Sequence, residues 1–580
     1  MGAVSYTRAT IATVTDHEWV IRQCLSGEAR FQGARRVRNL TPYSQDVNIT
    51  WNKVSLTVSG TKVAYTDGSL IGQTIISAAA SAAHYASNNT WPVVIWNTYL
   101  FSVSVKAAWV NFVQLAFAAS TAYQNFNLTN WSMTGTAGAG SVVDEWNGWY
   151  RCTVKFVSTL ATNAGQGIVI ISSMSDARLL ANLWDGVSGI SICRMQLEDV
   201  TGQSVQTPAE YVSTNVLSSP FHGAMVDWVK YFDTDISGNQ LSPDGYLAEW
   251  QKTNLFTDSE DFSLWTKAGT WVITPNATIA PDGRMTADLF TLSTANEWQS
   301  VNKSITTTAS IYGYSVFVKP NGHNYVQLLT SAGINSGYMN FDLLNWVVWT
   351  SSSYTGRIEA LPNGWYRLKI TTGTVLAATG AFIIAAVPSA SASRGSFVKG
   401  TGTSWVYLWW AQLEVGATSS YISSTLGTRN DDILEYQLRN LQSTKWTVYA
   451  EATTYFTSNN VALLWLTGSS CRILWSPSTA PWFIRSGTQV ITNEGSSNLI
   501  SSNSVAASQY DRVLWKYSWS AQEICLNGTL TSGAFDGTTS FTNLYIGNAW
   551  VSRALYGSIR NLQIWDYEIS DAEAVALTTI

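Results

Sequence analysis

The feature that most constrains the fold is an internal duplication, in which a set of residues recurs in the same order about 215 positions later. The segment 147–151 (NGWYR) recurs unchanged as 363–367. Further matches run through both halves in the same order, namely Asn39-Leu40 with Asn254-Leu255, Asp67-Gly68 with Asp282-Gly283, Val113-Gln114-Leu115 with Val326-Gln327-Leu328, Gln196-Leu197-Glu198 with Gln412-Leu413-Glu414, and Tyr211 with Tyr421. Because order and spacing persist from end to end, the sequence predicts two copies of one domain.

Each copy carries the pattern of short antiparallel strands. Residues 314–319 (YSVFVK) alternate between inward and outward positions, as a half-buried strand does. Asn363-Gly364 is a turn signal, and the alternating segment 365–370 follows it. Apolar residues do not follow a 3.6-residue period over any long segment. We therefore predict an all-β protein made of tandem antiparallel β-sandwich (jelly-roll) domains.

The limits of the repeat and the shifts in composition divide the chain into five parts. They are an N-terminal anchor or lead-in (1–36), the first copy (37–215), a connector (216–250), the second copy (251–428) and an unduplicated β-sandwich (429–580). The Pro, Gly and Asp clusters of the connector predict ordered turns. Near the C-terminus, Ser570 is a candidate N-cap for a short helix through Ala574–Leu577.

Charge and cysteine content exclude several classes of protein. A net charge of −5 argues against nucleic-acid binding, which needs a basic face. The short basic cluster Arg35, Arg36 and Arg38 is interpreted as a solvated linker. The start of the chain lacks a secretory signal, and no apolar stretch is long enough to insert into a membrane. Five scattered cysteines without a C-x-x-C pair predict buried free thiols, not a disulfide framework or a zinc site.

Several matched segments carry a resemblance to a known module: 253–255, 259–262, Trp265, 281–283, 363–367 and 411–414. Together they resemble a β-sandwich module that is widespread in phage virion proteins and related in style to carbohydrate-binding sandwiches. The resemblance implies a head fibre, head spike or tail fibre. The first copy departs from the pattern, because Arg38 stands where the second copy has Thr253 and Val47 where it has Phe262.

The C-terminal part is similar to the concanavalin A-like or laminin-G-like fold. The residues that carry this resemblance are 526–528 (LNG), 544–547 (LYIG) and the ending 557–573. The resemblance implies a lectin-like β-sandwich.

The 28 tryptophans need a physical reason, and most of them are expected to fill cores and interfaces. Trp149 and Trp365, in the repeated NGWYR segment, are interpreted as core residues. Adjacent strand residues point to opposite faces, so Trp409 and Trp410 are candidates for an exposed aromatic contact with a sugar. The other carbohydrate-binding candidates lie in the third sandwich: Trp515, Trp519 and Trp550.

The paired aspartates of the two copies allow two interpretations. Asp46 and Asp67 match Asp261 and Asp282, and their carboxylates could hold a structural calcium ion. Hydrogen bonding within Asx turns would explain the same residues equally well. No other cofactor is expected.

Catalysis finds little support in the sequence. The four histidines have no partners at the spacing of a metal site or a catalytic triad, and a glycosidase needs two carboxylates flanking a sugar bond. We therefore expect a non-enzymatic virion-surface structural protein that contacts host glycans. A purely structural capsid or tail component is the alternative, and a glycan-degrading tailspike a distant one.

The virion interpretation also implies partners and a site of synthesis. Other virion proteins would bind through the N-terminal region, and the outward modules would meet host cell-surface polysaccharide. The chain would be made in the host cytoplasm and assemble as a homo-oligomer, with a trimer the expected form.

Overall fold

The structure of this chain is a computed structural model that describes 4–90, 93–118, 120–136, 139–161, 165–215, 224–350, 354–403, 405–437, 445–454, 461–467, 471–476, 489–494, 497–504, 510–518, 521–534, 543–546 and 557–579. The chain divides into two compact units, residues 35–241 and residues 1–34 with 242–580. Within the described residues the strand pairs are antiparallel and a single α-helix occurs, so the predicted all-β class is confirmed.

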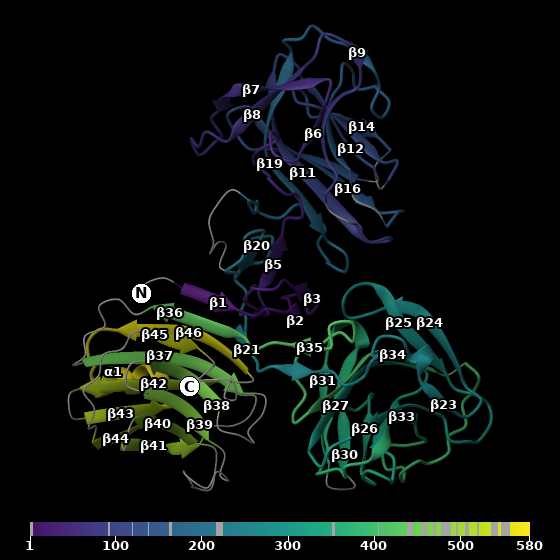
Figure 1. Ribbon diagram of the computed structural model, residues 1–580, viewed down its shortest axis with the longest axis vertical. Coiled ribbons are helices and arrows are strands. Elements are labelled where there is room, and N and C mark those ends of the chain that lie inside the picture. Colours follow the sequence, from purple (N-terminus) through teal and green to yellow (C-terminus); the bar gives the residue numbers. More distant parts are fainter. Residues whose placement is uncertain are drawn as a thin grey trace. The chain divides into compact units, whose positions relative to one another are not determined.

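The first copy of the duplicated domain is a sandwich of two six-stranded sheets (Figure 1). One sheet has the order β14 (Met133–Gly135), β13 (Tyr123–Asn127), β12 (Phe112–Phe117), β17 (Gln166–Ile170), β10 (His84–Asn88) and β6 (Asn52–Val54). The other has the order β15 (Ala139–Asp144), β16 (Trp149–Val157), β11 (Thr98–Ala108), β19 (Gly189–Asp199), β8 (Gly72–Ser77) and β7 (Leu56–Val63). Alternate residues of both sheets, such as Val103 and Leu115, form the core between them.

The second copy repeats this topology strand for strand. Its sheets have the orders β30 (Val347–Thr350), β29 (Tyr338–Asp342), β28 (Tyr325–Thr330), β33 (Thr379–Ala386), β26 (Ser300–Thr306), β23 (Thr266–Ala268), and β31 (Thr355–Ala360), β32 (Tyr366–Thr371), β27 (Tyr312–Asn321), β34 (Trp405–Val415), β25 (Met285–Thr291), β24 (Val272–Ile279). A register shift between β11 and β19 recurs at the matching place between β27 and β34. The two copies therefore share sheet order and irregularities as well as sequence.

The third sandwich is completed by strands from distant parts of the chain. One sheet has the order β1 (Val4–Thr7), β36 (Ile433–Gln437), β45 (Asn543–Ile546), β38 (Val461–Thr467), β39 (Cys471–Ser476), β40 (Gln489–Glu494), β41 (Ser497–Ser504). The other has the order β4 (Phe31–Gln32), β21 (Gly245–Ala248), β46 (Gly557–Trp565), β37 (Lys445–Thr454), β42 (Asp511–Ser518), β43 (Ala521–Leu526), β44 (Thr529–Ala534). Figure 1 shows the purple strand β1 beside β36. Residues 1–34 are thus part of the unit formed with 242–580.

The chain ends on the predicted helix. Helix α1 (Asp571–Thr578) begins after Ser570, whose hydroxyl accepts a hydrogen bond from the Glu573 backbone N–H. The Glu573 carboxylate in turn accepts from the Ser570 backbone N–H, which completes a capping box.

Short two-stranded pairs and 3₁₀ turns lie outside the larger sheets. They are β2 (Ala12–Thr15) with β3 (Ile21–Cys24), β5 (Arg35–Arg38) with β20 (Val229–Phe232), β9 (Ser81–Ala82) with β18 (Asn182–Leu183), β22 (Lys252–Thr253) with β35 (Thr428–Arg429), η1 (Phe262–Leu264) and η2 (Pro362–Gly364). The prediction of a solvated linker at 35–38 is therefore wrong, because these residues form strand β5, which pairs with β20. Arg35 is buried, bonds Glu210 at 2.6 Å and stacks over the ring of Phe232.

Two matched asparagines, Asn39 and Asn254, are buried and bind backbone groups of loops through their side-chain amides. The Asn39 amide donates to the carbonyl oxygens of Met195 (2.9 Å) and Val212 (2.8 Å). Its oxygen accepts from the backbone N–H groups of Thr41 and Leu197. Asn254 makes the matching set of four bonds in the second copy. These residues recur because each one satisfies several buried backbone groups at once.

Four cysteines of the described residues are free. Cys24, Cys152, Cys193 and Cys525 are buried and unbridged, as predicted for free thiols. In the part of the chain that the structure describes, no helix has both the length and the apolar character to cross a membrane.

A buried carboxyl gives the first copy a pH-dependent stability. Burial raises the pKa of Glu198 to about 7. The folded state therefore holds a proton that the unfolded state releases near its ordinary pKa, so stability falls as pH rises between these values. We expect Glu198→Gln to raise the free energy of unfolding at pH 8 by about 2–3 kcal/mol and to change little at pH 4. Thermal unfolding at both pH values measures this.

The control for this prediction is Asp185→Asn in the same unit. Asp185 is exposed, and hydrogen bonds from Ser188 hold its pKa low, at about 2. Its replacement should give no gain at pH 8. An equal effect of Glu198→Gln at both pH values would contradict the raised pKa.

Candidate functional site

A pocket of about 400 Å³ lies within the unit of residues 1–34 and 242–580. Most of its lining comes from four stretches of the chain. They are the β31–β32 edge of the second copy, the β2–β3 hairpin, residues around β21 and the loop 418–421. The size is that of a small-molecule or oligosaccharide subsite. Sequence analysis did not predict it, because no local pattern joins these segments.

One wall of the pocket is a patch of charged side chains on β31 and β32. Strand register places Arg357 opposite Lys369 and Glu359 opposite Arg367, and alternate residues share a face. Lys369 Nζ lies 2.7 Å from Glu359 Oε1, and Arg357 Nε lies 3.7 Å from the same oxygen. Burial opposes ionisation of Glu359, but the neighbouring Lys369 and Arg367 cations hold its pKa below the ordinary value. The carboxylate is thus ionised at neutral pH.

Other lining residues are uncharged or acidic. Gln32 and the hydroxyls of Thr13 and Thr15 contribute hydrogen-bonding atoms. Trp19, at the tip of the β2–β3 hairpin, contributes an aromatic ring that is about half exposed. Burial raises the pKa of Asp244, which also lines the pocket.

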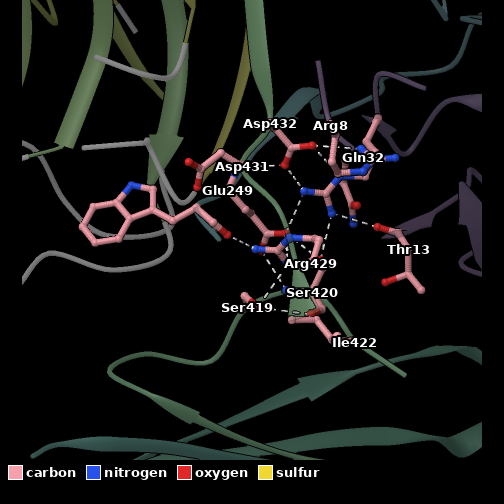
Figure 2. A network of polar contacts seen from close by, with 12 residues as sticks. Arg8, Thr13, Gln32, Glu249, Ser419, Ser420, Ile422, Arg429, Asp431 and Asp432 are labelled. Carbon is pink, nitrogen blue, oxygen red and sulfur yellow. Dashed lines mark hydrogen bonds and ion pairs between the residues drawn. The ribbon is translucent and has the colours of Figure 1, made fainter. Parts of the chain in front are cut away.

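Next to the pocket lies a buried ion cluster, here called the arginine network (Figure 2). It comprises Arg8, Arg30, Arg429, Glu249 and Asp432, all nearly inaccessible to solvent. Arg30 bonds both carboxylates, at 2.9 Å to Glu249 and more closely to Asp432. Arg8 bonds Asp432 at 2.9 Å, and Arg429 bonds Glu249 at 3.0 Å. The network joins the N-terminal segment, the connector and the residues that follow the second copy.

The network fixes the ionisation of its acids. Burial alone would neutralise Glu249, but Arg429 and Arg30 hold its pKa far below the ordinary value. Burial also opposes ionisation of Asp432, but the Arg30 and Arg8 cations hold its pKa below the ordinary value. Ser420 adds hydrogen bonds to Glu249 from its backbone N–H (2.7 Å) and its hydroxyl. Glu249, Ser419 and Ser420 also line the pocket, so the network sets the shape of that side.

The expected aromatic contact at Trp409 and Trp410 has a different geometry. The β27–β34 register shift leaves Trp410 as the extra, left-handed residue (φ 37°), so the two rings are not on opposite faces. They stack on each other with centroids 3.6 Å apart, and Trp410 stacks on Tyr421 at 3.8 Å. Trp409 is only 1% exposed. The Trp409 ring is therefore part of the core, where no sugar can reach it.

In the third sandwich, the one candidate tryptophan that the structure describes is also buried. Trp515 is 1% exposed and packs edge-on against Trp446 at 4.6 Å, so it is a core residue and not a surface platform. Trp519 and Trp550 lie outside the described residues. Trp149 and Trp365 are buried, as predicted.

The paired aspartates bond to their own turns. Asp46, Asp67, Asp261 and Asp282 each accept a hydrogen bond from the backbone N–H two residues later. Within the described residues no three acidic, His or Cys side chains gather as a metal site would require. The Asx-turn interpretation accounts for these residues, and calcium binding stays a prediction.

Comparisons with known proteins assign no family. No protein-family model matches the sequence, and no curated protein does. Among solved structures, a Bacteroides ovatus protein proposed to bind carbohydrate is similar at 8% identity, with 50% of this chain and 82% of that chain covered and a TM-score of 0.22. The tandem CBM22 modules of Paenibacillus barcinonensis Xyn10C align at 12% identity, over 66% of this chain and 99% of that chain, with a TM-score of 0.19.

A third similarity concerns an animal protein. Domains LG4-5 of the mouse laminin α1 chain align at 11% identity over 48% of this chain and 88% of that chain, with a TM-score of 0.17. At these TM-scores no property of the three proteins transfers to this chain.

Proposed function

We propose that this chain is a non-catalytic virion-surface protein of a bacteriophage that contacts host glycans through the pocket. The observation that carries the glycan contact is the pocket lining. It offers cationic donors, ionised acceptors, amides and hydroxyls within one concavity of about 400 Å³. Sugars present dense, alternating donors and acceptors, and such mixed polar linings satisfy them.

The virion role rests on the resemblance of the duplicated module to phage fibre and spike sequences. Tandem sandwiches suit an outward-projecting spacer. Oligomers would multiply a modest affinity per site, because many copies on one particle bind together. A structural component without a glycan ligand remains the alternative role.

Hydrolysis is the second candidate function, and one observation favours it. Asp244, with a raised pKa, and Glu359, held ionised, line the same pocket, and a glycosidase pairs a protonated acid with an ionised carboxylate. Against it, the Glu359 carboxylate already bonds Lys369, which weakens it as a nucleophile or base. Release of reducing ends from a bound polysaccharide, lost in Asp244→Asn, would favour hydrolysis.

The glycan proposal is tested on the full chain, because β1, β4 and β21 complete the third sandwich and a 430–580 fragment would lack them. A glycan array identifies ligands, and calorimetry measures their affinity. Arg357 is half exposed and lines the pocket, so Arg357→Ala should leave folding intact. We expect it to weaken binding by roughly tenfold or more, the value of a charge-assisted hydrogen bond.

Lys399→Ala is the matched control, since Lys399 is exposed and does not line the pocket. It should bind as the unmodified chain does. Absence of any array ligand, or equal loss in both variants, would overturn the pocket as the glycan site and favour the purely structural role.

A further inference from the structure

Tryptophan is found repeatedly where the backbone is left-handed. Among the described residues, 20 non-glycine residues have positive φ, and eight of them are tryptophan against six asparagines. Asparagine tolerates this region, whereas a bulky side chain there is a genuine outlier. The eight are Trp19, Trp96, Trp109, Trp131, Trp146, Trp228, Trp346 and Trp410. A residue type that makes up 28 of 580 positions is thus the commonest non-glycine residue in a conformation it should avoid.

The β2–β3 hairpin shows which residue such a position requires. Trp19 N–H donates to the Asp16 carbonyl at 3.0 Å, and Asp16 N–H donates to the Val20 carbonyl at 3.0 Å. This is a turn followed by a left-handed bulge residue, for which glycine is preferred. The same two bonds at the same spacing close three other turns of this chain, where the left-handed residue is glycine each time: Gly68 (φ 83°), Gly238 (φ 86°) and Gly283 (φ 81°).

The duplication supplies an independent comparison. Val105-Lys106 and 113–115 align with Val318-Lys319 and 326–328 at one constant offset, which pairs Trp109 with Gly322. The backbone is alike at the two positions, with φ of 78° at Trp109 and 85° at Gly322. One copy of the domain therefore places glycine where the other places tryptophan.

Burial does not explain most of these tryptophans, although Trp410 stacks on Trp409 and Tyr421. Six of the eight are more than half exposed, and Trp109 is 90% exposed. By contrast, the core residues Trp265 and Trp365 are buried and have ordinary φ values of −87° and −83°. The chain thus contains two classes of tryptophan, one defined by packing and one by a backbone conformation that suits glycine. A sugar-stacking role would explain exposure but not the left-handed backbone.

We infer that these eight positions are glycine in the protein as its host makes it, because the codon there is UGA. That codon specifies tryptophan in one variant genetic code and glycine in another. Reading a glycine-coding UGA as tryptophan would replace glycines and leave the UGG-encoded core tryptophans untouched. The partner implied is a glycyl-tRNA that decodes UGA, so the host of this virion protein uses the glycine code.

The inference is independent of the glycan proposal, and it alters the pocket at one position. With glycine at 19 the aromatic ring leaves the lining, while Arg357, Glu359 and Lys369 remain. It also removes most of the exposed tryptophans from the surface.

The decisive experiment combines codon inspection with peptide mass spectrometry of the full chain purified from its natural source. We expect UGA at the eight left-handed positions and UGG at Trp265 and Trp365. The peptides that span the eight positions should each be lighter by the mass difference between tryptophan and glycine. UGG codons at these positions, or peptides of tryptophan mass, would overturn the inference.

A recombinant comparison tests the physical basis separately. The full chain with all eight tryptophans changed to glycine should melt at a temperature several degrees higher than the chain with tryptophan. Trp349→Gly is the matched control, because Trp349 is half exposed but lies in strand β30 without a positive φ. That change should not raise the melting temperature. A lower melting temperature for the eightfold variant would contradict the inference.

Discussion

Replacing Arg30 by methionine is expected to lower the free energy of unfolding of the 1–34 and 242–580 unit by about 3–5 kcal/mol. Arg30 is the residue of the arginine network that bonds both carboxylates, and its side chain is inaccessible to solvent. Methionine retains much of the stem volume but leaves Glu249 and Asp432 buried with one fewer cation. An uncompensated buried charge costs more than the original pair contributes. Urea unfolding of the full chain measures the effect.

The control is Lys303→Met, which removes an ion pair with Asp258 that is partly exposed. Solvent screens such a pair, so we expect a loss below about 1 kcal/mol. The network should also weaken in acid, because the pKa of Asp432 is lowered on folding and its contribution is lost as pH falls below the ordinary carboxyl range. Equal losses for Arg30→Met and Lys303→Met would show that the network does not hold the unit together.

The duplicated architecture could be predicted because its signals are local and repeated. Turn residues, alternating strands and the buried amides recur at a fixed spacing, and each copy obeys the same packing constraints. The structure adds the reason for the conserved order. Asn39 and Asn254 make the same backbone bonds, and both copies keep the same register shift.

The site could not be predicted in this way, because its residues meet only after folding. Arg8 and Asp432 bond across 424 residues of sequence, and no spacing rule links them. Strand register also limits prediction from alternation, since the shift between β27 and β34 places Trp409 and Trp410 ring on ring. Alternation of residues along a strand does not reveal a β-bulge, because the bulge inserts one extra residue and shifts the faces of the residues that follow it.

The tryptophan content shows how composition can mislead. Taken alone, 28 tryptophans favour sugar-stacking platforms as well as cores. Backbone conformation separates the two populations, since Trp109 is left-handed and exposed while Trp365 is extended and buried. The case for glycan contact therefore rests on the polar walls of the pocket and not on exposed rings.

Changing Asn254 to alanine is expected to destabilise the same unit by about 4 kcal/mol, because four buried backbone groups each lose a hydrogen bond worth about 1 kcal/mol or more. The amide donates to the carbonyls of Ala411 and Ile422, and its oxygen accepts from two backbone N–H groups. These bonds anchor the end of the second copy to its first residues. Differential scanning calorimetry of the full chain should show the loss in the transition of this unit.

The duplication provides the matched test of this prediction. Asn39→Ala should produce a loss of similar size in the unit of residues 35–241, because Asn39 makes the same four bonds there. Asn302→Ala serves as the control, since its single bond to the Thr266 carbonyl is exposed and water can replace it. A large loss for Asn254→Ala without one for Asn39→Ala would mean that the two copies, although alike in sequence and sheet order, depend on different interactions for their stability.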